Sequence, residues 1–288
     1  MASTQQLKSR IRSVKSTKQI TKAMQMVAAS KMRRAQEETK ASAEYAHAAN
    51  ELLSYLASQG ATRSHKWFDD RTIKSRLIIL IASDKGLAGA YNSNVFKRYI
   101  KTLRDDEATG VKNMTIAVGR KASHFATRIK DVEILGTYED LPDMPDGAQF
   151  HAILNTAKDA FESKQVDAVD VVFTRFVSSI TQTAEVTRLF PAGLEDTEVS
   201  ATVRDALYEP SVERVLDDAA YRLIGARLFQ GLLDARASEH SMRMLAMKNA
   251  TDNASDLVED LTLEMNKARQ GAITQELSEI SAGVEAMK

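Results

Sequence analysis

The residues that come nearest to a catalytic motif form a glycine-containing loop at residues 83–92, SDKGLAGAYN. The loop follows an apolar run and precedes a predicted helix, the position at which glycine-rich loops bind phosphate groups through backbone N–H groups. It lacks the third glycine of the dinucleotide-binding fingerprint and the Gly-Lys-Ser/Thr of a P-loop. These departures favour the alternative, a tight strand-to-helix turn in which Asn92 or Ser93 caps the helix.

Other side chains with reactive chemistry are scattered or absent. The chain has no cysteine, which excludes disulfides and thiolate sites. No Gly-x-Ser-x-Gly elbow occurs, and the five histidines have no metal-ligand spacing (His47, His65, His124, His151 and His240). The sequence therefore predicts no catalytic residue, no cofactor site and no metal site.

The N-terminal residues are strongly basic. Residues 1–34 contain nine Lys or Arg and no Asp or Glu, a composition that resembles a mitochondrial targeting peptide. However, the helical pattern continues past Glu37 and Glu38 to about residue 57, beyond the length of a cleavable presequence. No aromatic residue precedes Tyr45, so this segment has no side chain on which nucleic-acid bases could stack. We expect a solvated or partner-facing helix surface and no nucleic-acid binding.

Glycine and proline divide the chain into three segments. The first glycine is Gly60, and all four prolines lie between residues 142 and 210. Before Gly60 the pattern predicts a helix with narrow apolar stripes, as in a coiled coil. One stripe consists of Leu7, Ile11 and Val14. A second stripe, shifted in phase along the helix, consists of Ile20, Met24 and Val27.

The C-terminal segment predicts a second long helix that begins after Pro210. At about 1.5 Å per residue its 75 or so residues would span about 115 Å. Its last apolar positions step by four and three: Ile273, Leu277, Ile280, Val284 and Met287. Residues 252–288 hold eight acids against three bases, which favours antiparallel pairing with the basic N-terminal helix.

The middle segment alternates strand and helix patterns. Residues 76–83, 114–118, 132–135 and 169–176 read as strands, and residues 184–190 read as an edge strand. Such alternation predicts a parallel-rich sheet covered by helices. The predicted fold class is α/β, with a long antiparallel coiled coil of the N- and C-terminal helices and an inserted Rossmann-like α/β domain. The predicted divisions are an N-terminal coiled-coil helix (1–58), an α/β domain with linkers (59–208) and a C-terminal coiled-coil helix (209–288).

Three stretches resemble signatures of the gamma subunits of F-type ATP synthases. They are residues 20–34 (ITKAMQMVAASKMRR), 243–254 (RMLAMKNATDNA) and 266–276 (NKARQGAITQE). The loop at residues 83–92 also resembles the turn after the family's first strand. Many family members carry a cysteine where this chain has Ala88, and the chloroplast-type cysteine insertion is absent, so no thiol chemistry follows from the resemblance.

The resemblance implies a rotary central-stalk subunit without active sites of its own. Its partners would be the ATP synthase alpha and beta subunits (one copy per three of each), the epsilon subunit and the membrane c ring. The subunit would transmit torque between the c ring and the catalytic beta subunits, and so couple ion flow to ATP synthesis or hydrolysis. It would be a peripheral protein at the cytoplasmic face of the bacterial plasma membrane. The longest apolar run, residues 77–82, is too short for a span of about 20 residues, so no direct membrane insertion is expected.

The resemblance also implies which residues meet partners. Arg269 and Gln270 match the pair that contacts the beta subunit, and Thr274 and Gln275 lie beside them. Three residues of the first helix match the part that faces the beta carboxylates: Lys22, Met24 and Lys31. Three others match the foot near the c ring: Tyr45, Tyr208 and Glu209.

Two other classes of protein fit the residue patterns without the resemblance. One is a coiled-coil scaffold protein with an α/β head that binds a different partner. The other is a small α/β enzyme that binds a nucleotide at residues 86–89 and uses its helical arms to oligomerise.

Overall fold

The computed structural model describes residues 4–130, 132–142, 147–194, 200, 203, 209 and 211–286, without side-chain detail for 42–45, 63–64 and 283–286. Its internal contacts divide the chain into two units. We call residues 29–242 the head unit, and residues 1–28 together with 243–288 the paired-helix unit. Each unit is described by itself.

Helices and strands occupy most of the described chain. The helices are α1 (Thr4–Ser58), the 3-10 helix η1 (Ala61–Ser64), α2 (Tyr91–Thr109), α3 (Arg120–Ala126), α4 (Gly147–Glu162) and α6 (Val212–Ala286). The strands are β1 (Ser75–Ile81), β2 (Lys112–Val118), β3 (Glu133–Tyr138), β4 (Ala168–Phe176) and β5 (Gln182–Phe190).

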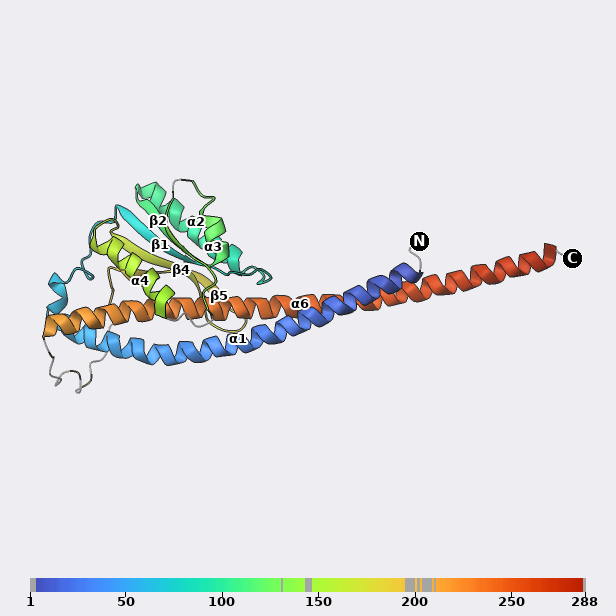
Figure 1. Cartoon of the computed structure of the whole chain (residues 1–288), viewed down its shortest axis with the longest axis horizontal. Coiled ribbons are helices and arrows are strands. Elements are labelled where there is room, and N and C mark those ends of the chain that lie inside the picture. The colour runs from blue at the N-terminus through green and yellow to red at the C-terminus, as the bar shows by residue number, and fades with distance from the viewer. Residues whose placement is uncertain are drawn as a thin grey trace. The chain divides into compact units, whose positions relative to one another are not determined.

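The head unit contains one five-stranded sheet with the order β3-β2-β1-β4-β5 (Figure 1). The first four strands in this order run parallel, and β5 pairs with β4 antiparallel at the edge. In the register, Leu77 of β1 lies opposite Met114 and Val169. The predicted α/β fold class is confirmed, and so is the edge position of the last strand.

Both faces of the sheet are covered, which explains the continuous apolar run of β1. Leu77, Ile79 and Ile81 belong to one core cluster, whereas Ile78 and Leu80 belong to the other. Helices α2 and α3 cover the second face, with Val95 and Tyr99 of α2 and two alanines of α3 in its core. A strand buried on both sides has no polar face, so its sequence does not alternate.

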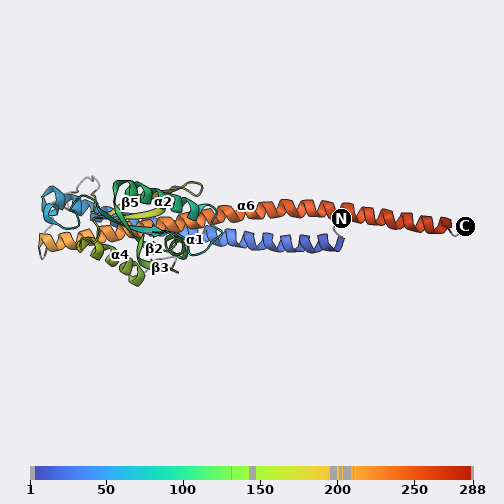
Figure 2. The same cartoon turned by 90° about the horizontal axis from the view of Figure 1, so that it is seen from above.

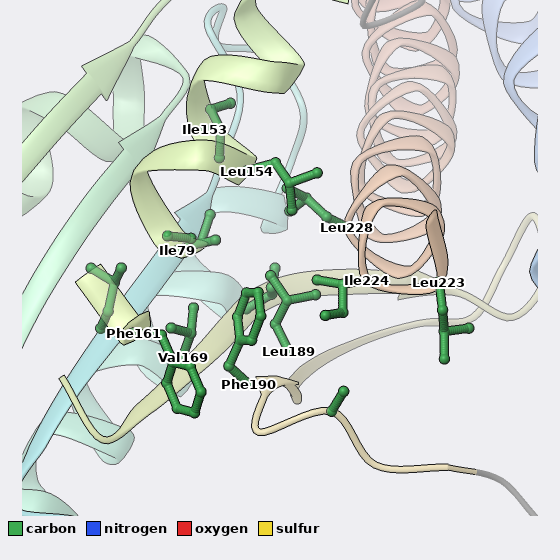
Figure 3. Close-up of a cluster of buried hydrophobic side chains, with 14 of the residues drawn as sticks. Ile79, Ile153, Leu154, Phe161, Val169, Leu189, Phe190, Leu223, Ile224 and Leu228 are labelled. Carbon is green, nitrogen blue, oxygen red and sulfur yellow. The ribbon is translucent and has the colours of Figure 1, made fainter. Parts of the chain in front are cut away.

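The larger core joins the sheet to α4, to the end of α1 and to the first part of α6 (Figure 3). Leu223, Ile224 and Leu228 of α6 are at most 1% exposed and belong to the same cluster as Val169 and Phe190 of the sheet. Ile224 points toward Leu189 and Phe190, and Leu228 lies beside Leu154 of α4. Leu53 and Leu56 of α1 belong to the same cluster. The helix therefore supplies one wall of the head's core.

A buried ionic network lies on the other face of the sheet. Asp170 of β4 is 2% exposed and forms ion pairs with Arg76 and Arg188. Arg76 also pairs with Asp106 of α2 at 2.9 Å. Burial raises the pKa of Asp106, and the Arg76 charge opposes that rise. The shared arginine joins α2 to two strands of the sheet.

The paired-helix unit is an antiparallel contact between the start of α1 and the later part of α6 (Figure 2). Leu7 and Ile11 pack with Leu261, and farther along α1 the Thr21 and Thr251 hydroxyls hydrogen bond at 2.8 Å. Residue numbers along α1 rise as the numbers of their partners on α6 fall, which confirms the predicted antiparallel pairing. The C-terminal end of α6 continues beyond the start of α1 (Figure 1).

The buried positions of α1 correct one expectation about its apolar stripes. Ile20 and Val27 are 58% and 56% exposed, whereas Thr21 and Ala28 are buried. Between residues 4 and 40 the buried positions are 7, 11, 21, 28, 32 and 35, which keep one heptad phase, although Lys18 at an intervening heptad position is exposed. Small residues at 21 and 28 keep the heptad, because a close helix contact needs small side chains rather than large ones.

Gly119 lies at the carboxyl end of β2, where a side chain has no room. Its φ is 93°, and an added Cβ would lie 2.1 Å from the carbonyl oxygen of Ala82. We expect Gly119→Ala to lower the free energy of unfolding by more than about 2 kcal/mol, through clash and backbone strain together. Denaturant unfolding measures this. Gly86→Ala is the matched control, because nothing lies within 4 Å of its added Cβ. Equal effects of the two changes would contradict the expectation.

Asp234 of α6 is 8% exposed, and its burial raises the pKa of the carboxyl to about 6, with Arg175 opposing and Glu185 adding to the rise. A raised pKa means that the folded state holds the proton more tightly than the unfolded state. The resulting stabilisation is complete below the ordinary pKa and is lost as the pH rises through about 6.

We therefore expect Asp234→Asn to be more stable than the wild type at pH 8, by about 1–2 kcal/mol after allowance for solvent screening, and nearly equal at pH 4. Denaturant unfolding of the isolated chain at both pH values tests this. The exposed carboxyl Asp105, changed to Asn, provides the control. A stability difference between Asp234→Asn and the wild type that does not change with pH would contradict the assignment.

Candidate partner interface

The loop at residues 83–92 is closed by its own side chains. Asn92 Oδ1 accepts the backbone N–H of Ser83 at 3.1 Å, and Asn92 Nδ2 donates to Ser83 Oγ at 2.8 Å. Helix α2 begins at Tyr91, so its N-cap is Ala90, which makes no side-chain cap bond. The expected capping by Asn92 or Ser93 is therefore wrong: both residues lie inside the first turn, and Asn92 holds the loop instead.

The space above this loop is filled by other parts of the head. Asp84 accepts the backbone N–H groups of Arg120 and Asp140 at 2.9 and 3.0 Å. Arg236 of α6 donates to the carbonyl oxygen of Leu141 at 2.7 Å. The void left between these elements is about 10 Å³, about the size of one water molecule. This geometry fits the tight-turn alternative.

The described residues offer neither a cluster of metal ligands nor a helix suited to cross a membrane. They contain no group of three or more His, Cys, Asp or Glu side chains arranged to hold a metal ion. In the same part of the chain, no helix combines the length and the apolar character that a membrane crossing requires. The remaining candidates are surfaces of the two long helices.

The predicted contact residues of α6 lie on a fully exposed stretch. Every residue from 269 to 282 is exposed. Thr274 Oγ1 donates to the carbonyl oxygen of Gln270 at 3.0 Å, and Gln275 Nε2 donates to Glu279 Oε1 at 3.0 Å. The structure thus brings Arg269, Gln270, Thr274 and Gln275 together on neighbouring turns of one helix.

The predicted contact residues of α1 differ in their surroundings. Lys22 is exposed and donates from Nζ to Gln25 Oε1 at 3.3 Å, whereas Met24 is half-buried. Both belong to the paired-helix unit. Lys31 is exposed but belongs to the head unit.

The structure describes only part of the predicted foot. Glu209 is exposed. Tyr208 lies outside the described residues. Tyr45 falls within α1, but its side chain is outside what the structure describes.

Exposed apolar side chains mark surfaces that the sequence patterns misassigned. Ile20, Met26 and Val27 of α1 are 56–59% exposed. Ile273, Leu277 and Ile280 of α6 are 49–64% exposed, although they have the 4-3 spacing of a coiled-coil stripe. The spacing was a correct signal for a stripe, but it could not tell a stripe that faces α1 from one that faces solvent.

Comparisons with known proteins agree along the whole chain. A family model described as ATP synthase matches residues 3–287. The gamma chains of ATP synthase from Xanthomonas oryzae pv. oryzae and Xylella fastidiosa are each 39% identical over 288 residues. The gamma chain from Stenotrophomonas maltophilia is 38% identical over the same length. All three alignments cover 100% of both proteins.

Solved structures share the fold. A chain of the Euglena gracilis mitochondrial ATP synthase (OSCP/F1/c-ring) superposes with a TM-score of 0.66 at 20% identity, covering 99% of this chain and 94% of that one. A chain of the Tetrahymena thermophila central stalk and c-ring gives 0.56 at 22% identity, covering 80% and 99%. The full-length identity to the bacterial proteins and the matching family model together mean that this chain belongs to the ATP synthase gamma chain family.

Proposed function

We propose that this chain is the rotary central-stalk subunit of an ATP synthase. The observation that carries the proposal is the exposed end of α6. A helix with an apolar stripe at 4-3 spacing and no partner of its own needs another protein to bury that stripe. The full-length relatedness of this chain to gamma chains supports other ATP synthase subunits as that partner.

The proposed partners are the alpha and beta subunits, with one gamma chain per three of each, the epsilon subunit and the membrane c ring. The similar solved structures support this set, since one is an assembly with F1 and a c-ring and the other is a central stalk with a c-ring. The nucleotide sites would lie on the partner subunits, so the chain would be a non-catalytic member of the complex. It would associate peripherally with the cytoplasmic face of the bacterial plasma membrane through these partners.

The proposed mechanism uses three segments. The helices at 1–58 and 209–288 would form a shaft that turns inside the alpha-beta ring, and the α/β domain at 59–208 would connect that shaft to the c ring. Because the shaft presents different side chains around its circumference, each orientation favours a different conformation of each beta subunit. Rotation driven by ion flow would thereby drive ATP synthesis, and ATP hydrolysis would drive the reverse rotation.

The proposed contacts with beta subunits are made by exposed polar and basic side chains and one methionine. On α6 these are Arg269, Gln270, Thr274 and Gln275, and on α1 they are Lys22, Met24 and Lys31. A basic surface on α1 complements carboxylates on a partner, and such complementarity speeds and orients association. Tyr45, Tyr208 and Glu209 are proposed to contact the c ring.

The alternative function is a coiled-coil scaffold with an α/β head. Co-expression with the cognate alpha and beta subunits distinguishes the two. The stalk proposal expects co-elution at one copy per ring in size-exclusion chromatography and ATP hydrolysis that depends on this chain. A chain that elutes alone and leaves hydrolysis unchanged would favour the scaffold.

Truncation after Gly271 tests the exposed end of α6. Removing residues 272–288 deletes the apolar stripe but leaves the contact of Leu7 and Ile11 with Leu261 intact. We expect assembly to survive and single-molecule torque to fall, because the lost contacts guide the end of the shaft and do not hold the ring together. Complete loss of assembly would contradict this division of roles.

Arg269→Ala tests the proposed beta contact. Arg269 is exposed, so we expect the free energy of unfolding of the isolated chain to change by less than about 0.5 kcal/mol. The melting temperature should therefore stay nearly unchanged. ATP-driven turnover of the complex should fall about tenfold if the side chain anchors an interface, since such anchors contribute more than about 1 kcal/mol. Lys267→Ala is the control, an exposed base two positions away. A lower melting temperature with normal turnover would make Arg269 a structural residue.

A further inference from the structure

One stretch of α6 in the head unit is buried but polar. Asp234, Ser238, Glu239, His240 and Ser241 are each at most 8% exposed. Earlier on the same helix, the buried positions are leucine, isoleucine, alanine and glycine. Burying polar groups is unfavourable unless they are hydrogen bonded, so this change of composition requires partners for the polar groups.

Three side chains of this stretch bond to strand β4 or to loops at the edge of the sheet. Arg236 donates to the Leu141 carbonyl at 2.7 Å and lies 3.5 Å from Asp84. The hydroxyls of Ser238 and Ser241 donate to carbonyl oxygens of residues 174 and 179, at 3.1 and 2.7 Å. Ser241 in turn accepts a bond at 3.2 Å from the Gln182 side chain.

The partners of these side chains all lie at or beyond the carboxyl ends of the parallel strands. Asp84 follows β1, Leu141 follows β3, and residues 174 and 179 lie at the end of β4 and in the turn to β5. The strand order places the change of winding direction between β1 and β4. In open α/β sheets a ligand binds in the crevice at this point. The void of about 10 Å³ that Leu232, Ala235 and Arg236 line lies instead at the carboxyl ends of β1 and β2.

We propose that these bonds form a torsional joint, which fixes the rotation of α6 about its own axis against the head. Its positioning residues are Arg236, Ser238 and Ser241, and we call this contact the edge joint. The inference rests on the proposed rotary function. An apolar helix contact tolerates sliding, because dispersion contacts are weakly directional. Hydrogen bonds weaken steeply when their angle changes, so the edge joint resists rotation of the helix.

Asp84 strengthens the joint by tying it to two further loops. Its Oδ1 accepts backbone N–H groups of Arg120 and Asp140, while its Oδ2 faces Arg236. Arg120 also forms ion pairs with Glu139 and Asp140. A force applied to any of these segments would therefore be transmitted through Asp84 to the guanidinium group of Arg236.

The test measures torsional stiffness in the assembled complex. The chain contains no cysteine, so Lys101→Cys on the exposed side of α2 gives this subunit a single labelling point. The angle of a bead attached at that point is recorded while the alpha-beta ring holds the shaft. The alpha and beta subunits used have had their reactive cysteines replaced, so that only this subunit is labelled. The variance of the bead's angle during the wait for ATP is inversely proportional to the torsional stiffness.

We expect Arg236→Gln, and separately the double change Ser238→Ala with Ser241→Ala, to raise this variance about twofold, because directional bonds to buried carbonyls are lost. Arg236→Lys should stay close to the wild type, since it retains a charged donor for the Leu141 carbonyl. Arg128→Gln, which removes an exposed charge from the head, should leave the variance unchanged.

The outcomes separate this inference from the function on which it rests. A lower melting temperature for Arg236→Gln and the double serine variant, with the angular variance of the wild type, would overturn the edge joint and make these residues structural only. If Arg236→Lys were as compliant as Arg236→Gln, the assignment to a charged donor would be wrong. A wild-type chain that assembles with the ring but never rotates would overturn the proposed function and the edge joint together.

Discussion

The apolar contact between the first part of α6 and the sheet is the interaction on which the head depends. Leu223, Ile224 and Leu228 are almost fully buried in it, and each such side chain contributes about 1.5–3 kcal/mol relative to an exposed one. A helix gains most of its stability from packing of this kind rather than from intrinsic propensity. Without α6, the cluster that contains Val169 and Phe190 would lose the side chains that α6 supplies, so the helix is part of the head's core and not an appendage to it.

The same helix changes character along its length, and each change matches what it contacts. Its first part is apolar and covers the sheet, and the stretch at residues 234–241 is polar and meets carbonyl groups of β4 and of loops. Within the paired-helix unit it contacts α1 through Leu261 and Thr251, and residues 269–282 are exposed. In the proposed rotor, these four parts would be, in chain order, the attachment to the head, the edge joint, the shaft and the surface that contacts partners. One continuous helix suits this use, because intrahelical hydrogen bonds carry load along its axis without a flexible linker.

The class and order of the elements were predictable because they depend on local pattern. Continuous apolar runs marked β1 and β4, since strands buried on both faces cannot alternate. The scarcity of glycine and proline marked α1 and α6. The exposure of Arg269, Gln270, Thr274 and Gln275 was also expected, because the resemblance to gamma subunits assigns them to a partner. The role of Asn92 was not predictable: a polar residue near a helix start can cap the helix or close the preceding loop, and only the position of Ser83 decides between them.

By itself the sequence determined which segments are helices and strands, the α/β class, and the family to which the chain is related. The elements and the class follow from composition and periodicity along the chain, and the family follows from stretches that resemble its signatures. The tertiary structure alone decided which stripe of α1 is buried. It also decided that Ile273, Leu277 and Ile280 are exposed, and that Arg236 meets Asp84 across about 150 residues of sequence. The physical reason is that a stripe's spacing states only that one side of a helix is apolar, whereas burial depends on which surface comes to lie against it.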